Sequence, residues 1–296
     1  MKRTSEFAFL KKLLLIVVLV LLPVTALAEV PWKWQTSLRI DKVGDSMYMP
    51  SAVSFNPESQ TYYVIDTGRN RLVSFGRDGK VLKAFTANKK LKAPFDMVRL
   101  ANGRLWVVEK GRNSLTLIDV AAKKITPHTL HDGESLVFPD RIAVAGGKLY
   151  ILDRASGQVL RLADDLSIEQ RFGCKDCSAG LTDFVIDGKS VLAIETIEKR
   201  IYRFALDGKV MAEYKLGDEA DFPVSLDVGP SGSIYVLDRH LNEVLAYSEN
   251  GQYRYSFLGT GQAAGNVYFA RQLRFDPWGQ LCVVDEGNGR VEIYGR

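Results

Sequence analysis

An apolar stretch that ends in an acidic residue recurs six times along the chain. The copies cover residues 63–66, 106–109, 150–153, 192–195, 235–238 and 282–285. Behind every acid, an apolar residue stands six positions later, and an aromatic or aliphatic residue stands nine positions later. Successive acids are 42 to 47 residues apart. A repeat of that length built from short strands is typical of β-propeller blades.

Each repeat divides into four predicted strands. A first strand follows a proline in several copies, as in residues 50–53 and 139–142, and the acid-terminated stretch is the second strand. Turn sequences such as Asn102-Gly103 and Asp207-Gly208 separate the strands, because these residues tolerate the backbone conformations of tight turns. We therefore predict an all-β fold, a six-bladed β-propeller with four antiparallel strands in each blade.

The sixth repeat ends at Arg296, after its third predicted strand. Residues 34–40, which precede the first repeat, resemble the predicted outer strands at 81–85 and 253–257. We predict that this N-terminal segment supplies the missing strand of the last blade. Such pairing closes the ring and removes an open sheet edge, which would otherwise promote aggregation.

Two of the turns resemble a known repeat family. Residues 66–72 (Asp-Thr-Gly-Arg-Asn-Arg-Leu) and 285–291 (Asp-Glu-Gly-Asn-Gly-Arg-Val) are similar to the core motif of NHL repeats, and Asn113 and Asn242 keep its asparagine in two other repeats. The resemblance extends over residues 50–296 and implies an exported, bacterial-type NHL propeller. It implies little about activity, because propellers host many unrelated functions.

The N-terminus has the pattern of a secretory signal peptide. Four Lys and Arg residues precede the apolar run 13–22, and Ala26 and Ala28 suit a signal peptidase. We predict a signal peptide over residues 1–28 and a single propeller domain over 29–296, in the periplasm or outside the cell. The apolar run falls short of the roughly 20 residues that a membrane span needs, so no stable span is expected after cleavage.

Removal of this segment changes the charge of the protein. The full chain has 39 Lys and Arg residues against 35 Asp and Glu residues, and residues 29–296 keep 35 against 34, a net charge of +1. A nearly neutral protein has no general electrostatic attraction to nucleic acid. We therefore expect no nucleic-acid partner, and we expect a monomer.

Three cysteines are present: Cys174, Cys177 and Cys282. Export favours a disulfide between Cys174 and Cys177, whereas the sequence near them lacks the further ligands that zinc or covalently attached haem requires. A redox role is the alternative, but no helix is predicted there to lower the thiol pKa. Cys282 stands where other repeats have Tyr or Trp, which predicts a buried thiol.

Candidate binding residues gather on one face of the predicted ring. We call the face that carries the turns behind the six acids the top face, because the first strand of each blade starts there as well. The six acids are predicted to cap their own turns; they are Asp66, Glu109, Asp153, Glu195, Asp238 and Asp285. The candidate ligand-binding residues are Asp96, Arg141, Asp183 and Gln272 at strand starts, with Arg154, Arg239 and His240 in the turns.

These features favour a non-catalytic binding or scaffold module that presents its top face to a protein, a peptide or a small polar ligand, without metal or cofactor. The alternative is an enzyme, because similar propellers include lyases and lactonases that hold a metal in the channel. In that alternative, Asp96 and Asp183 are candidate calcium ligands. His240 is the one histidine placed near the mouth of the predicted channel, and no Ser or Cys partner for it is identified.

Overall fold

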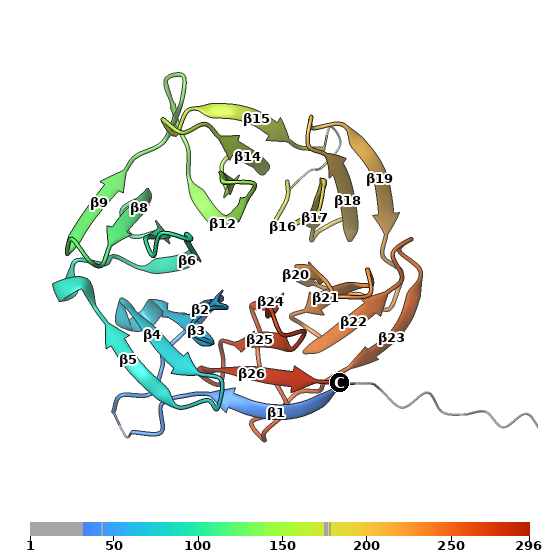
Figure 1. The fold of residues 1–296 in the computed structure, drawn as a ribbon. Helices are drawn as coiled ribbons and strands as arrows, with labels where there is room; N and C mark the ends of the chain where they lie inside the picture. Colours follow the sequence, from blue (N-terminus) through green and yellow to red (C-terminus); the bar gives the residue numbers. More distant parts are fainter. Residues whose placement is uncertain (1–31, 43, 175–176, 178) are drawn as a thin grey trace, which may run out of the picture. The chain divides into compact units, whose positions relative to one another are not determined.

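A computed structural model describes residues 32–42, 44–174, 177 and 179–296. Within them, six four-stranded antiparallel sheets stand side by side around a common centre, so residues 32–296 form a six-bladed β-propeller, as predicted (Figure 1). No α-helix occurs in the described ranges, and none of their helices is long and apolar enough to cross a membrane. The predicted signal peptide lies outside the described residues.

The strands of each blade are paired in chain order. Blade 1 has β2 (Pro50–Asn56), β3 (Thr61–Asp66), β4 (Arg71–Gly76) and β5 (Val81–Phe85). Blade 2 has β6 (Pro94–Arg99), β7 (Leu105–Glu109), β8 (Ser114–Asp119) and β9 (Lys124–His128). Blade 3 has β12 (Pro139–Ala145), β13 (Lys148–Asp153), β14 (Gln158–Leu162) and β15 (Ile168–Phe172).

The second half of the ring repeats this plan. Blade 4 has β16 (Asp183–Asp187), β17 (Ser190–Glu195), β18 (Arg200–Ala205) and β19 (Val210–Lys215). Blade 5 has β20 (Pro223–Val228), β21 (Ile234–Asp238), β22 (Glu243–Tyr247) and β23 (Tyr253–Phe257). Blade 6 has β24 (Gln272–Phe275), β25 (Leu281–Asp285), β26 (Arg290–Gly295) and β1 (Lys33–Leu38). The short elements are η1 (Thr67–Arg69), η2 (Ala87–Lys89), β10 (His131–Asp132) and β11 (Ser135–Leu136).

The N-terminal strand closes the last blade, as predicted. In Figure 1, β1 lies beside β26, and the pairing brings Trp34 opposite Tyr294 and Leu38 opposite Val291. The carboxylate of Glu292 accepts hydrogen bonds of 2.7 Å from both Trp34 Nε1 and Ser37 Oγ. Leu38 is fully buried, so the strand contributes to the core as well as covering a sheet edge.

The hydrophobic core lies between neighbouring blades. One cluster joins Val53 and Val73 of blade 1 to Val284 and Val291 of blade 6. Equivalent clusters lie between other pairs of neighbouring blades. Cys282 is fully buried in the same cluster, and burial raises the pKa of its thiol well above the ordinary value. The apolar positions that recur in the sequence are thus the positions at which blades contact each other.

Cys174 and Cys177 form a disulfide, as predicted, with their Cα atoms 5.5 Å apart. They belong to the connection between β15 and β16 and pack against the cluster that contains Tyr150 and Phe184. The disulfide is compatible with export.

Candidate functional site

The six repeat acids are occupied by backbone hydrogen bonds. Each accepts at least one backbone N–H, and four of them fix the loop that leads into their own blade: Tyr48 N donates to Asp66, Lys92 N to Glu109, Phe138 N to Asp153, and Tyr268 N to Asp285. Asp238 binds the loop before its blade and the turn that follows it, whereas Glu195 binds the backbone of the turn that follows it. Burial raises the pKa of Asp66 and Asp285. No three of these six carboxylates, all among the described residues, are arranged to hold a metal ion.

A pocket of about 420 Å³ opens on the top face, over the central channel. Two positions of the repeat line it. One is the residue immediately before the strand-start positions predicted above: Phe95, Asp140, Thr182, Val224 and Arg271. The other is the residue directly after an acid: Lys110, Thr196 and Arg239. We call this cavity the top-face pocket.

A local break in strand register explains how the first set reaches the pocket. In blades 2, 3 and 5 the register between first and second strand shifts across the residues that hold Phe95, Asp140 and Val224. A bulge of this kind leaves one residue unpaired and redirects its side chain. As a result, the side chains of consecutive residues point in different directions. Asp140 faces the pocket, while Arg141 extends from the pocket towards Asp183 in the channel.

The pocket is strongly basic. Lys110, Arg141, Arg239 and Arg271 line it, against the single lining carboxylate of Asp140. Glu286 lies beside them and pairs with Arg239 at 2.8 Å and with Arg271 at 2.9 Å. These two arginines hold the pKa of Glu286 below its ordinary value, although burial opposes them. Four cations therefore face two carboxylates, which favours an anionic ligand.

Three of these cations surround one aromatic ring. The Lys110 ammonium lies 3.2 Å from the centroid of the Phe95 ring, and the guanidinium carbons of Arg141 and Arg271 lie 4.9 Å and 5.2 Å from it. The negative face of an aromatic ring attracts cations, so Phe95 holds like charges close together. Arg141 is 4% exposed, and its Nε and Nη1 atoms donate no hydrogen bond to any described residue. Buried donors without partners are costly, which makes Arg141 a natural receptor for an oxyanion.

The pKa of Lys110 lies below the ordinary value of a lysine. Burial lowers the pKa of its ammonium, and the neighbouring Arg141 and Arg271 lower it further, whereas Asp140 opposes the shift. The ammonium lies 2.5 Å from Asp140 Oδ1. Lysines are recruited as bases where burial and nearby positive charge increase the neutral fraction near physiological pH.

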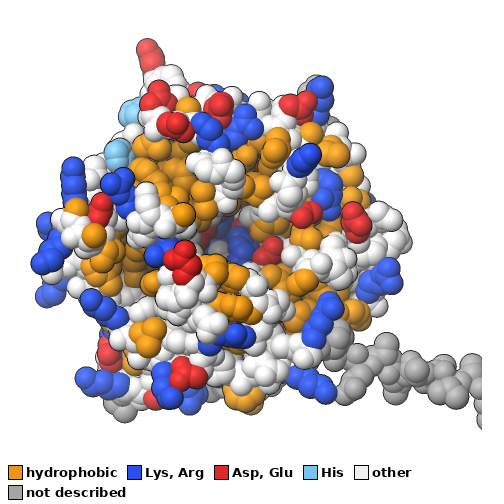
Figure 2. Space-filling model, in the orientation of Figure 1, with side chains coloured by type: hydrophobic (Ala, Val, Ile, Leu, Met, Phe, Trp, Pro, Cys, Tyr) orange, Lys and Arg blue, Asp and Glu red, His pale blue; other side chains and the backbone are white. Residues whose placement is uncertain are grey.

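The channel below the pocket holds a buried ion-pair network, and Figure 2 shows acidic and basic side chains in the hollow at the centre of the ring. Both carboxylate oxygens of Asp183 accept hydrogen bonds from Arg274, at 2.8 Å and 2.9 Å. Burial would raise the pKa of Asp183, but Arg274 and Arg141 hold it below its ordinary value. Burial raises the pKa of Asp227 to about 6 and also raises that of Asp96.

These residues do not suit calcium, which takes 6–8 oxygen ligands, several of them carboxylates. The oxygens of Asp183 are already bound to the guanidinium of Arg274, and Asp96 accepts the backbone N–H groups of Met97 and Ile142. Across the part of the chain that the structure describes, no three His, Cys, Asp or Glu residues are arranged to hold a metal ion. Arg274 and Arg141 are the cations that lie beside Asp183.

The structure separates the predicted ligand-binding residues into three groups. Asp96, Asp183 and Gln272 lie buried around the channel, where the Gln272 side-chain oxygen accepts the N–H of Val53. Arg141 and Arg239 line the top-face pocket. The remaining two do not line that pocket: Arg154 is exposed in its turn, and His240 stacks on Phe222 with Nδ1 3.0 Å from Asp221.

No protein-family model and no curated protein sequence matches this chain; its NHL resemblance rests on the turn motifs alone. Solved structures do match. A streptogramin B lyase superposes with a TM-score of 0.65 at 13% identity, covering 89% of this chain and 97% of that one. A virginiamycin B lyase from Staphylococcus aureus superposes with a TM-score of 0.64 at 15% sequence identity, covering 90% of this chain and 99% of that one. A gluconolactonase from Xanthomonas campestris superposes with a TM-score of 0.64 at 19% sequence identity, covering 88% of this chain and 97% of that one.

These comparisons correct the predicted function. The expectation of a non-catalytic scaffold that presents its top face to a partner is wrong, because the three solved propellers compared above, which match nearly the whole ring, are two lyases and a gluconolactonase. At such low identities the likeness establishes the fold alone. A reaction can be proposed only from the residues of this chain itself.

Proposed function

We propose that the protein is a lyase- or lactonase-like propeller enzyme that opens an ester bond in an anionic substrate bound in the top-face pocket. One observation carries the proposal: Lys110, a lysine with a lowered pKa, lies on the same aromatic ring as Arg141, a buried arginine with unused hydrogen-bond donors. A base beside a fixed positive charge is the combination that proton abstraction next to a carbonyl or carboxylate requires.

In the elimination that we favour, the neutral amine of Lys110 removes a proton from the carbon next to a substrate carboxylate. Arg141 stabilises the negative charge that develops on that carboxylate, with Arg271 and Lys110 itself, once protonated, adding to the field. The C–O bond at the neighbouring carbon then breaks, and the ester oxygen leaves with the electron pair as a carboxylate. The products are an alkene and a carboxylate, and no other reactant is consumed.

Hydrolysis is the second candidate, favoured by the hydroxyl groups of Thr182 and Thr196, which lie 2.8 Å apart on the wall of the pocket. They offer a position for a water molecule that Lys110 would deprotonate for attack on the carbonyl carbon. The same arginines would then stabilise the tetrahedral oxyanion. Both reactions open a lactone, and they differ in which C–O bond breaks.

We further propose that the enzyme acts outside the cytoplasm, as an exported protein of the NHL type. The pattern of residues 1–28 supports export. A disulfide such as that between Cys174 and Cys177 forms and persists in oxidising compartments. The turn motifs at 66–72 and 285–291 support the NHL resemblance.

A panel of lactones and linear esters, each with and without a carboxylate, tests the proposal. We expect proton NMR to detect opening of a carboxylated member by the purified protein, with unchanged turnover in the presence of a chelator. In water enriched in ¹⁸O, elimination leaves the acid product unlabelled and produces alkene signals, whereas hydrolysis incorporates the label. A panel in which nothing opens, or turnover that depends on an added metal, would contradict the proposal.

A further inference from the structure

A second cavity, of about 440 Å³, lies between blades 1 and 2, away from the top-face pocket. Its lining includes the turn between β6 and β7 and the turn between β8 and β9. Both turns are at the face opposite to the repeat acids, because each follows a strand that starts on the top face. Its volume is within the roughly 300–1,000 Å³ typical of small-molecule pockets.

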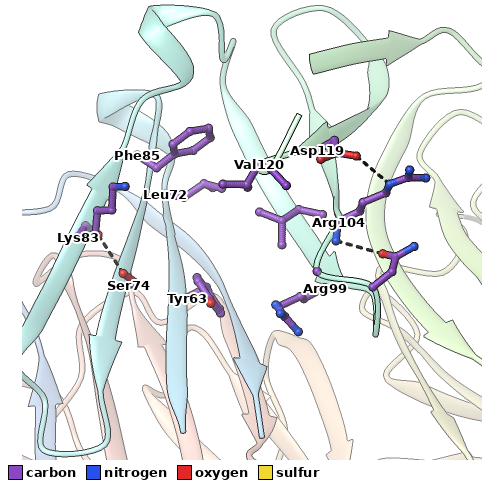
Figure 3. A pocket seen from close by; sticks show the side chains of 13 residues that line it. Tyr63, Leu72, Ser74, Lys83, Phe85, Arg99, Arg104, Asp119 and Val120 are labelled. Atoms are coloured by element: carbon purple, nitrogen blue, oxygen red, sulfur yellow. Dashed lines mark hydrogen bonds and ion pairs between the residues drawn. The ribbon is translucent and has the colours of Figure 1, made fainter. Parts of the chain in front are cut away.

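The walls of this inter-blade pocket are apolar. Figure 3 shows Leu72, Phe85 and Tyr63 of blade 1 across a space from Val120 of blade 2. Leu72 and Leu105 are only 3% and 5% exposed, so the cavity reaches into the core cluster that these blades share. An open apolar cavity of this kind loses packing contacts, and an apolar group would restore them.

The rim carries an excess of positive charge. Lys83, Arg99 and Arg104 line it with the single acid Asp119. Arg104 Nε is 3.0 Å from Asp119 Oδ2, so this pair is neutralised internally (Figure 3). Among the described residues, Arg99 and Lys83 have no carboxylate partner, and Arg99 is half-buried beside the apolar wall.

We propose that the inter-blade pocket binds a small amphipathic carboxylate, with its acyl chain against Leu72, Phe85 and Leu105 and its carboxylate on Arg99. The apolar lining selects the chain, and the unpaired guanidinium selects a negatively charged head group, to which it donates two parallel hydrogen bonds. The site lies apart from the top-face pocket and does not depend on the proposed activity.

Titration of the full-length protein with decanoate in a calorimeter tests this site, with decanol as the neutral ligand of equal chain length. We expect saturable binding of one decanoate per chain and at least tenfold weaker binding of decanol. The variant Arg99→Gln should weaken decanoate binding by about tenfold or more, since a hydrogen bond to a charged group contributes about 1.5–3 kcal/mol. Ser74→Phe, which places an aromatic ring in the cavity, should abolish binding.

Two matched variants separate recognition from folding. Arg99→Lys keeps the charge and should bind decanoate more tightly than Arg99→Gln does. Arg104→Gln removes a cation that Asp119 already neutralises, and it should change affinity less than about threefold, since exposed ion pairs contribute little. Equal binding of decanol and decanoate, equal binding by wild type and Arg99→Gln, or unchanged binding by Ser74→Phe would each overturn the proposal.

Discussion

Replacing Lys110 by methionine should lower kcat/KM for the opened ester by about 10²- to 10⁴-fold, the usual contribution of a positioned base. Methionine keeps the apolar length of the lysine side chain over Phe95 but cannot take a proton. Steady-state kinetics on the substrate found in the ester panel provide the measurement.

Lys148→Met is the matched control for this variant. Lys148 lies on the opposite face of the ring and pairs with the exposed Asp164 at 3.0 Å, so its removal should leave kcat/KM within about twofold and stability nearly unchanged. If Lys110→Met folds normally and keeps wild-type kcat/KM, Lys110 is not the base, and the assignment of the reaction to the top-face pocket fails.

Arg274→Met should lower the free energy of unfolding by about 3–5 kcal/mol, the cost of breaking a buried ion pair from one side. Asp183 is fully buried and depends on Arg274 for two of its hydrogen bonds. Without the guanidinium, its carboxylate is left as a buried charge whose nearest cation is Arg141, at 3.7 Å. Urea unfolding followed by circular dichroism measures the difference.

The double variant Arg274→Met with Asp183→Leu should recover much of that loss, because replacing both partners of a buried pair by apolar groups is often nearly neutral. Arg104→Met, which breaks a partly exposed pair with Asp119, should cost less than about 1 kcal/mol. A double variant as unstable as Arg274→Met alone would show that the charge of Asp183 is not the cause.

The architecture was predictable because the same pattern of apolar and acidic positions recurs six times along the chain. The apolar residues behind each acid are the contacts between blades, as Val73 and Val291 illustrate. The closing strand was predictable as well, since residues 34–40 resemble the other outer strands. In the structure β1 spans Lys33–Leu38, a small difference at a strand end, where side-chain pattern constrains the boundary least.

Part of the lining of the top-face pocket stands one residue before the candidates that the sequence offers. Arg141 and Arg239 are singled out by the sequence and line the pocket, whereas Phe95, Asp140 and other lining residues stand one position before a candidate. The reason is the register shift at the first strand of several blades, because a bulge changes which side chain faces the mouth. A pattern of apolar and polar residues does not reveal that one extra residue.

Two omissions have different origins. Asp227 and Arg274 stand two residues after Ser225 and Gln272, and alternation along a strand places them on the same channel face, so the sequence contained that signal. Lys110 could not be singled out from sequence, because its lowered pKa depends on Arg141, Arg271 and burial, which the fold brings together. The sequence pairs no histidine with an identifiable nucleophile, and it therefore favoured a non-catalytic module.

The pH dependence of kcat/KM in wild type and in Asp140→Asn tests the central claim most directly. If the neutral amine of Lys110 is the base, kcat/KM rises with pH to a plateau, with its midpoint below the ordinary lysine pKa of 10.5. Asp140 is the group that opposes the lowering of that pKa, so Asp140→Asn should move the midpoint to still lower pH. A midpoint at the ordinary lysine value, or one that does not move in Asp140→Asn, would contradict the account.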